Sequence, residues 1–187
     1  MKELEITPDK YPDVSYNFIF FVDVALVFFY LFGFMVGVFL YQNARWRPRT
    51  ILIVGGSIAI AGCYFSSYAR SLNTFILLYC CVSSTGYGIC TIPHTMCAWE
   101  WFPDYKGLVN GVISCGYGFG GLLFLQLSTD LVNPDGKNPD IYNKKNDVTY
   151  FDESVSNRVP LMLRELCLVW IWFVLFGIIF VKKKPRA

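Results

Sequence analysis

The chain has 187 residues, of which 55% are hydrophobic and 16% are charged, and its formal net charge is +2. Soluble domains carry about 25% charged residues, so this composition excludes a soluble globular enzyme, and so small a net charge excludes a nucleic-acid-binding module. The charges gather at the termini, in short clusters and in one long loop. The apolar runs between them reach about 18 residues or more, which is long enough to cross a bilayer. An integral membrane protein in contact with lipid is therefore expected.

Five apolar segments follow one another along the chain. Their predicted bounds are 18–41, 51–68, 75–98, 108–131 and 161–181. Each segment must satisfy its own backbone hydrogen bonds in lipid, so each is predicted to be a helix, and the fold class is an all-α membrane protein with five transmembrane helices. The predicted organisation is a polar N-terminal arm, a bundle with one long extramembrane loop, and a basic tail, at 1–17, 18–181 (loop 132–160) and 182–187.

The basic residues predict the orientation. The turn at 42–50, the turn at 104–107 and the C-terminus hold eight Lys and Arg with only two acids, Glu100 and Asp104. The other ends of the segments also carry eight basic residues, but these are spread over about twice the length and are accompanied by twelve acids. The positive-inside rule therefore places the C-terminus in the cytosol or matrix and loop 132–160 on the opposite side. The Asn, Asp, Pro and Gly residues at 132–140 predict successive turns there.

Small residues form a stripe on the fourth segment. At 100° per residue its members share one face; they are Gly107, Gly111, Ser114, Gly118 and Gly121. Such a face lets helix backbones approach closely, so we expect the glycines to be packing residues, with a cavity-lining face as the alternative. A similar line on the second segment, formed by Gly55, Ala59, Gly62 and Ser66, also predicts packing.

The third segment carries a polar face. It is formed by Ser83, Tyr87, Cys90, His94 and Cys97, and Pro93 is expected to bend the helix. Polar groups at membrane depth usually face a bundle interior or a wet cavity. The candidates for a substrate path are therefore Tyr87, His94 and Ser114, with a satisfied structural imidazole as the alternative for His94.

Catalytic and cofactor chemistry is not predicted. The only histidine is His94, no two of the seven cysteines form a CxxC pair, and no acid pair shares a face. Metal sites and catalytic sites need clusters of such groups. We therefore expect no enzyme activity, no metal and no cofactor.

The run Trp101–Phe124 resembles the major facilitator superfamily, in particular its oxalate/formate antiporter and monocarboxylate transporter branch. In that branch the turn between the fourth and fifth helices reads WFPDxxGLxxG and precedes a glycine-rich helix. Arg45–Gly56, the residues Gly86 to Pro93 and the loop motifs at 132–135 and 158–160 also resemble that family, so the similarity covers about residues 13–181. The resemblance implies helices two to six of the first six-helix half, a partial bundle without the first helix. It also implies that the basic residues for a substrate carboxylate belong to the second half.

Alternating access requires two halves that rock about a central site, and the resemblance covers part of one. We therefore expect a degenerate half-transporter that acts as an accessory or structural subunit of a larger membrane complex, with other membrane protein subunits and lipids as partners. A mitochondrial respiratory assembly in the inner membrane is the expected host, with the plasma membrane and other membranes left open. The alternative is half of a split or dimeric carrier, and only then is a small carboxylate a partner. A fragment without a stable role is the third hypothesis.

Overall fold

The computed structural model describes residues 16–139, 141–143 and 148–182. The elements in chain order are α1 (Tyr16–Gln42), α2 (Pro48–Ser66), α3 (Leu72–Phe75), the π-helical segment Ile76–Ser83, α4 (Ser84–Trp101), the 3₁₀ turn Pro103–Tyr105, α5 (Lys106–Val132), β1 (Ile141–Asn143), β2 (Val148–Tyr150), α6 (Glu153–Ser156) and α7 (Val159–Phe180). Most of the N-terminal arm predicted at 1–17 and all but Lys182 of the basic tail lie outside the described residues.

The described residues contain five helical stretches that are long and apolar enough to cross a membrane, which confirms the predicted fold class. The predicted bounds differ from the observed ones by a few residues at each end. The second helix begins at Pro48, because the fixed φ of proline suits a first turn, where no backbone amide is needed. The third stretch runs without interruption from Leu72 to Trp101 through Pro93, so neither this proline nor the nearby glycines end the helix.

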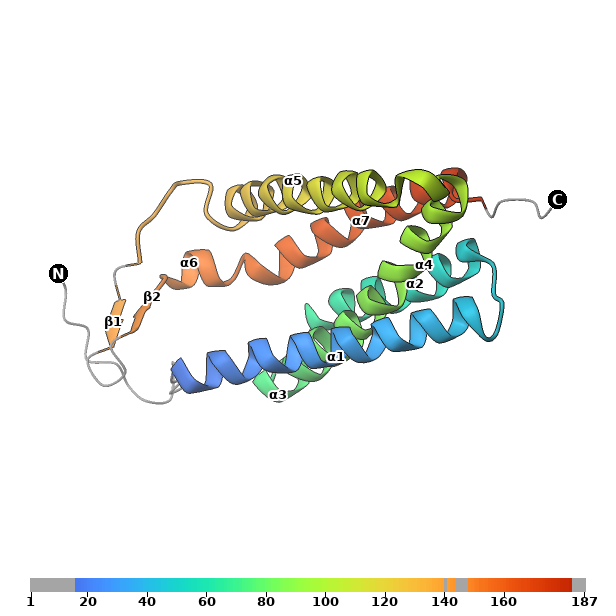
Figure 1. The fold of residues 1–187 in the computed structure, drawn as a ribbon. Coiled ribbons are helices and arrows are strands. Elements are labelled where there is room, and N and C mark those ends of the chain that lie inside the picture. Colours follow the sequence, from blue (N-terminus) through green and yellow to red (C-terminus); the bar gives the residue numbers. More distant parts are fainter. Residues whose placement is uncertain (1–15, 140, 144–147, 183–187) are drawn as a thin grey trace.

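Figure 1 shows the five long helices lying side by side, with successive helices running in opposite directions. The α1–α2 turn, the α4–α5 turn and the end of α7 lie at one end of the bundle, and the hairpin and α6 lie at the other. The basic turns therefore share one end with Lys182, as the distribution of Lys and Arg predicts.

The loop after α5 has more structure than its sequence predicted. Its first turn is as expected: the Asn133 side chain accepts from the amide of Lys137 at 2.9 Å and donates to that residue's carbonyl at 2.8 Å. Gly136 has φ +61°, which glycine adopts without strain. The short antiparallel pair β1–β2 and the helix α6 were not predicted. Strands of three residues and a helix of four are too short to show a periodic pattern of apolar and polar residues.

The core lies where α4 crosses α1 and α2, and glycines make this contact. A Cβ on Gly88 would meet the backbone of Tyr30 and Phe34 in α1, and a Cβ on Gly62 would lie 2.7 Å from the Ser83 amide nitrogen. The predicted stripe of α2 is buried along its length, which confirms its packing role; its members are Gly55, Ala59, Gly62 and Ser66. Glycine thus brings helix backbones into direct contact in this half of the bundle.

The other half of the bundle is open. Helix α5 contains no buried residue, and it contacts α4 and α7 only sparsely. A Cβ added to Gly107, Gly111, Gly118 or Gly121 would find no atom within 4 Å. The packing expected for this stripe is therefore not made among the described residues, because α5 stands apart from its neighbours, and Gly121 borders a cavity. Whether it packs against another chain stays a prediction.

Side chains from α2 and α4 hold the last turn of α7. The guanidinium of Arg49 donates to the carbonyl oxygens of Val181 at 2.6 Å and Ile179 at 3.0 Å. The indole N–H of Trp101 donates to the Lys182 carbonyl at 2.7 Å, and the Cys97 thiol donates to the same oxygen at 3.2 Å. Helix ends leave carbonyls without intrahelical donors, so these contacts satisfy the end of α7 and tie three helices together.

Candidate substrate-path site

A cavity of about 420 Å³ lies between α2, α4, α5 and α7. Its walls are almost wholly apolar, and its polar side chains are Tyr87 and Cys90 from α4, Tyr117 from α5 and the indole of Trp170 from α7. Three glycines of α5, at 116, 120 and 121, and Gly56 of α2 keep the space free of side chains. On the rim, Tyr117 is 56% exposed and Phe173 is 63% exposed, so the cavity opens at the surface of the bundle.

His94 joins α4 to α5 beside this cavity. Its Nδ1 lies 2.8 Å from the Cys90 carbonyl oxygen, and its Nε2 lies 3.0 Å from the Tyr117 hydroxyl. A carbonyl oxygen can only accept, so Nδ1 carries the hydrogen, and in the neutral ring Nε2 accepts from the tyrosine. Both ring nitrogens are therefore engaged, and the tautomer is set by the backbone of the same helix. A proton added at Nε2 would reverse the direction of the bond to Tyr117.

Tyr87 lies in the wall of the cavity, one turn before Cys90. Its ring makes an edge contact with Trp170 of α7, with centroids 5.7 Å apart, and Phe124 of α5 makes a second edge contact with the same indole at 6.1 Å. Among the described residues the Tyr87 hydroxyl makes no hydrogen bond, whereas the Cys90 thiol donates to the Leu52 carbonyl at 3.7 Å. The Tyr87 hydroxyl and the Trp170 indole N–H can therefore still donate to a ligand.

The polar face predicted on the third segment points into the bundle. Ser83 donates to the Ala59 carbonyl of α2 at 2.9 Å, while Tyr87 and His94 face α7 and α5. The structure does not bring Ser114 to them, since this residue is exposed and does not line the cavity. Tyr117 and Phe124 also line the cavity but were not predicted as site residues. Their seven-residue spacing places them on one face of α5, beside the face that carries the glycine stripe.

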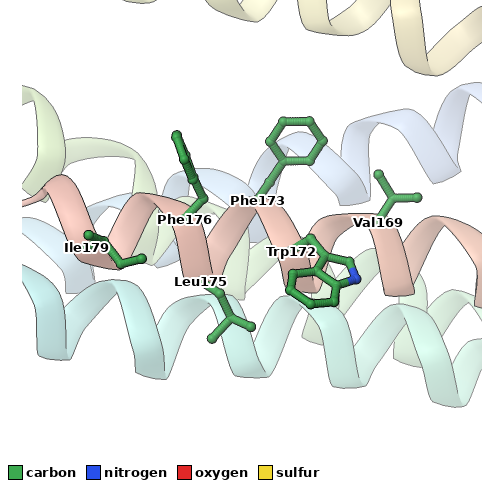
Figure 2. Close-up of a pocket in the computed structure, with 6 residues that line it drawn as sticks. All are labelled: Val169, Trp172, Phe173, Leu175, Phe176 and Ile179. Carbon is green, nitrogen blue, oxygen red and sulfur yellow. The ribbon is translucent and has the colours of Figure 1, made fainter.

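A second hollow, of about 530 Å³, lies on α7. Figure 2 shows that its lining side chains, among them Trp172, Phe176 and Ile179, all project from this one helix. Trp172 is 74% exposed, and no polar side chain other than its indole lines the hollow. It is a groove between side chains on a face that lipid covers in a membrane, so the four-helix cavity is the better candidate site.

The side chains at this site offer hydrogen bonds for binding a ligand. The polar groups that line it are two phenols, the Cys90 thiol and the Trp170 indole, with the His94 imidazole beside them, and no Lys, Arg, Asp or Glu lines it. Such groups can donate and accept hydrogen bonds and can pass a proton between Tyr117 and His94. They provide no cation for an anionic substrate.

Part of the chain is similar to known transporters. It is 29% identical over 118 residues to the apicoplast pyruvate carrier 1 of Toxoplasma gondii, covering 62% of this chain and 22% of the carrier. It is 34% identical over 92 residues to the oxalate:formate antiporter of Oxalobacter formigenes, covering 49% and 22%, and 28% identical over 91 residues to monocarboxylate transporter 13 of Rattus norvegicus, covering 49% and 21%.

The chain therefore spans about a fifth of the length of the curated relatives it matches. These partial relatives are major-facilitator-type transporters, which confirms the resemblance seen in the sequence, and the chain is a transporter-like membrane protein. No family model matches the chain. No solved structure matches it either.

Proposed function

We propose that this chain forms one side of a carrier for small carboxylates. The observation that carries this proposal is the hydrogen-bonded pair of His94 and Tyr117, which joins α4 to α5 beside a cavity at membrane depth. A polar pair at membrane depth is energetically costly unless it faces the bundle interior or a water-filled substrate path. The relatives named for pyruvate, oxalate and formate, and monocarboxylates support a carboxylate as the substrate class.

The carrier requires more than the described helices. The cavity has no cationic side chain, and an ionised carboxylate is expensive to hold in an apolar site without one. The charge that binds the substrate therefore comes from other helices, from another chain or from a longer form of this one. In this arrangement α4 and α5 line the path, and His94 orients Tyr117 toward it.

Uptake into liposomes tests this proposal. The chain is reconstituted with the polypeptides that co-purify with it, and uptake of radiolabelled pyruvate and oxalate is compared with that of empty vesicles. His94→Ala and Tyr117→Phe are expected to lower uptake at unchanged protein content, whereas Tyr105→Phe, at the bundle end and away from the cavity, is the matched control. Uptake that is equal in all three variants would exclude the pair from the path.

A structural role in a larger membrane complex is the second candidate. The open face of α5 favours it, because a Cβ added to any of its six glycines would find no described atom of another element within 4 Å, whereas a Cβ on glycines of α1, α2 and α4 would meet neighbouring helices directly. A partner helix would complete the same kind of packing. Native-gel mass after mild detergent extraction separates the two candidates when it is combined with uptake: a large complex without uptake supports the structural role. Fractionation of tagged protein then tests the mitochondrial inner membrane as host.

A further inference from the structure

Two cysteines from α2 and α7 lie against one another inside the bundle. Cys63 is 0% exposed and Cys167 is 1% exposed, and both belong to one buried cluster with Leu163. Side chains of the described helices surround this cluster; they are Ile60, Phe75, Tyr79, Met162 and Trp170. The two thiols are therefore buried by this chain itself, whatever else lies against the bundle in the membrane. Both are free cysteines in the structure.

The register of the two helices brings these thiols face to face. Three contacts run along the antiparallel seam between α2 and α7; they pair Arg49 with Val181, Gly56 with Val174, and Ser67 with Arg164. Seven residues make about two turns of helix, so a step of seven returns to the same face. Cys63 lies seven residues after Gly56, and Cys167 lies seven residues before Val174. The two cysteines are therefore a matched pair on this seam.

Hydrogen bonds give the two sulfurs different roles. The side chains of Cys63 and Cys167 are hydrogen-bonded to one another, and the Cys167 sulfur also lies 3.8 Å from the Ile60 carbonyl oxygen. The carbonyl can only accept, so Cys167 donates to it and Cys63 donates to the Cys167 sulfur. The S–H of Cys63 would therefore stabilise a thiolate at Cys167, and the thiolate is the reactive form of cysteine. Cys167 is the better nucleophile of the pair.

The surroundings of the pair select the oxidant. The cluster is apolar and neither sulfur is exposed, so a charged or bulky reagent would have to leave water and displace packed side chains. Hydrogen peroxide is uncharged and little larger than water, so small packing fluctuations admit it. A cysteine that is oxidised to a sulfenic acid beside a second thiol condenses with it to a disulfide.

We propose that Cys63 and Cys167 form a peroxide-sensitive pair that closes to a disulfide between α2 and α7. The Cys167 thiolate attacks one oxygen of hydrogen peroxide and the O–O bond breaks. The products are a sulfenic acid and a hydroxide, which takes up the proton that the thiol lost. The Cys63 sulfur then attacks the sulfenic sulfur, and a second water leaves with the Cys63 proton. In all, two thiols lose two electrons and one peroxide is reduced to two waters.

The disulfide would lock the part of the seam that lies away from Arg49. Arg49 fastens α2 to the last turn of α7 at one end of the bundle. The disulfide would join the same two helices near the other end, about one turn from the contact of Ser67 with Arg164. Neither cysteine lines the four-helix cavity, so the inference does not depend on the proposed function.

Peptide mapping after oxidation tests this proposal. Membranes that contain the full chain are treated with hydrogen peroxide, denatured in N-ethylmaleimide to block the remaining thiols, and digested without reductant. We expect the peptide that contains Cys63 to be joined to the peptide that contains Cys167, with a mass two hydrogens below their sum. The linked species should increase with peroxide until it saturates, and it should vanish after treatment with dithiothreitol.

Three variants sharpen the test. Cys63→Ser removes the second thiol, so the sulfenic acid at Cys167 should persist and be trapped by dimedone added with the denaturant. Cys167→Ser removes the nucleophile and should lose both the link and this dimedone adduct. Cys80→Ser is the matched control, because Cys80 is also 0% exposed but lies outside the cluster, and here the link should form as in the wild type. Circular dichroism checks that the helices of each variant are intact.

Two outcomes would overturn the proposal, and both are read from the unsubstituted chain. One is the recovery of Cys63 and Cys167 as N-ethylmaleimide adducts at peroxide concentrations that oxidise the exposed Cys115 completely, which would make the pair inert packing residues. The other is a link that forms no more often in native membranes than in membranes denatured before the peroxide is added, which would show that the register does not bring the thiols together.

Discussion

Replacing a glycine by alanine is predicted to have opposite effects on stability in α4 and in α5. Gly88→Ala adds a Cβ that would lie 2.6 Å from the Phe34 amide nitrogen and against the carbonyl oxygen of Tyr30. Ordinary carbon contacts begin at about 3.5 Å, so α1 and α4 must separate by about 1 Å. Both neighbours are backbone atoms and cannot rotate away. Gly118→Ala, by contrast, adds its Cβ where no atom lies within 4 Å.

The magnitudes follow from this geometry. Overpacking costs about 1–3 kcal/mol, and replacing a helical glycine by alanine returns about 0.5–1 kcal/mol. Gly88→Ala should therefore destabilise by up to about 2.5 kcal/mol, while Gly118→Ala should stabilise by about 0.5–1 kcal/mol. For a chain of this size 1 kcal/mol shifts Tm by about 2–4 °C, so Tm should fall by up to about 10 °C in the first variant and rise by about 1–4 °C in the second.

Thermal unfolding in detergent, followed with a thiol-reactive dye, measures both shifts. The thiols of Cys63, Cys80 and Cys167 are buried and react only when the bundle opens, and replacing the exposed Cys115 and the half-buried Cys81 and Cys90 by serine lowers the background. If Gly88→Ala raised Tm as much as Gly118→Ala, the direct contact between α1 and α4 would be refuted. If Gly118→Ala lowered Tm in the isolated chain, the open face of α5 would be refuted.

Three further predictions concern the two ends of the bundle. A cysteine placed at Asn138 should be labelled from the side opposite Lys182, because the loop and the end of α7 lie at opposite ends of the bundle, and labelling of both positions from one side would contradict the fold. Arg49→Met removes two charge-assisted hydrogen bonds to the end of α7 and should lower the free energy of unfolding by about 1.5–3 kcal/mol. The measurements are a lower Tm and faster proteolysis after α7. Arg47→Met is the control, because no such bond is found for Arg47 among the described residues. The amide N–H of Glu153 and the Ser154 hydroxyl, which both donate to the carboxylate, hold the pKa of Asp152 below its ordinary value of 3.8. The stabilisation of α6 is therefore present at neutral pH and lost as pH falls below the ordinary value and through that lowered pKa. The protection of the Glu153 amide against hydrogen exchange, taken relative to the intrinsic rate at each pH, should therefore decrease between about pH 5 and pH 2, and Asp152→Asn should remove this pH dependence.

The sequence by itself determined the features that depend on the membrane and on helical periodicity. Lipid leaves an apolar segment of this length one stable state, so five helices followed from hydropathy alone. The stripe on α2 was also readable, since Gly55 and Ala59 recur at the spacing of one helix face and that face is buried. The inward direction of Tyr87 and His94 was also predicted, because polar groups at membrane depth usually face the bundle, although Ser114 does not.

The tertiary structure decided which of two similar patterns is used. The stripes of α2 and α5 have the same spacing and residue type. A Cβ added to Gly62 would meet the backbone of a neighbouring helix, whereas a Cβ added to Gly111 would find no described atom of another element within 4 Å. Periodicity defines a face but does not say what lies opposite it, because that depends on how the helices are arranged around one another. The cavity, the bond from Tyr117 to His94 and the contact of Arg49 with the end of α7 join residues that are 23 to 132 positions apart. Contacts of this kind depend on distance in space, and no local pattern in the chain records it.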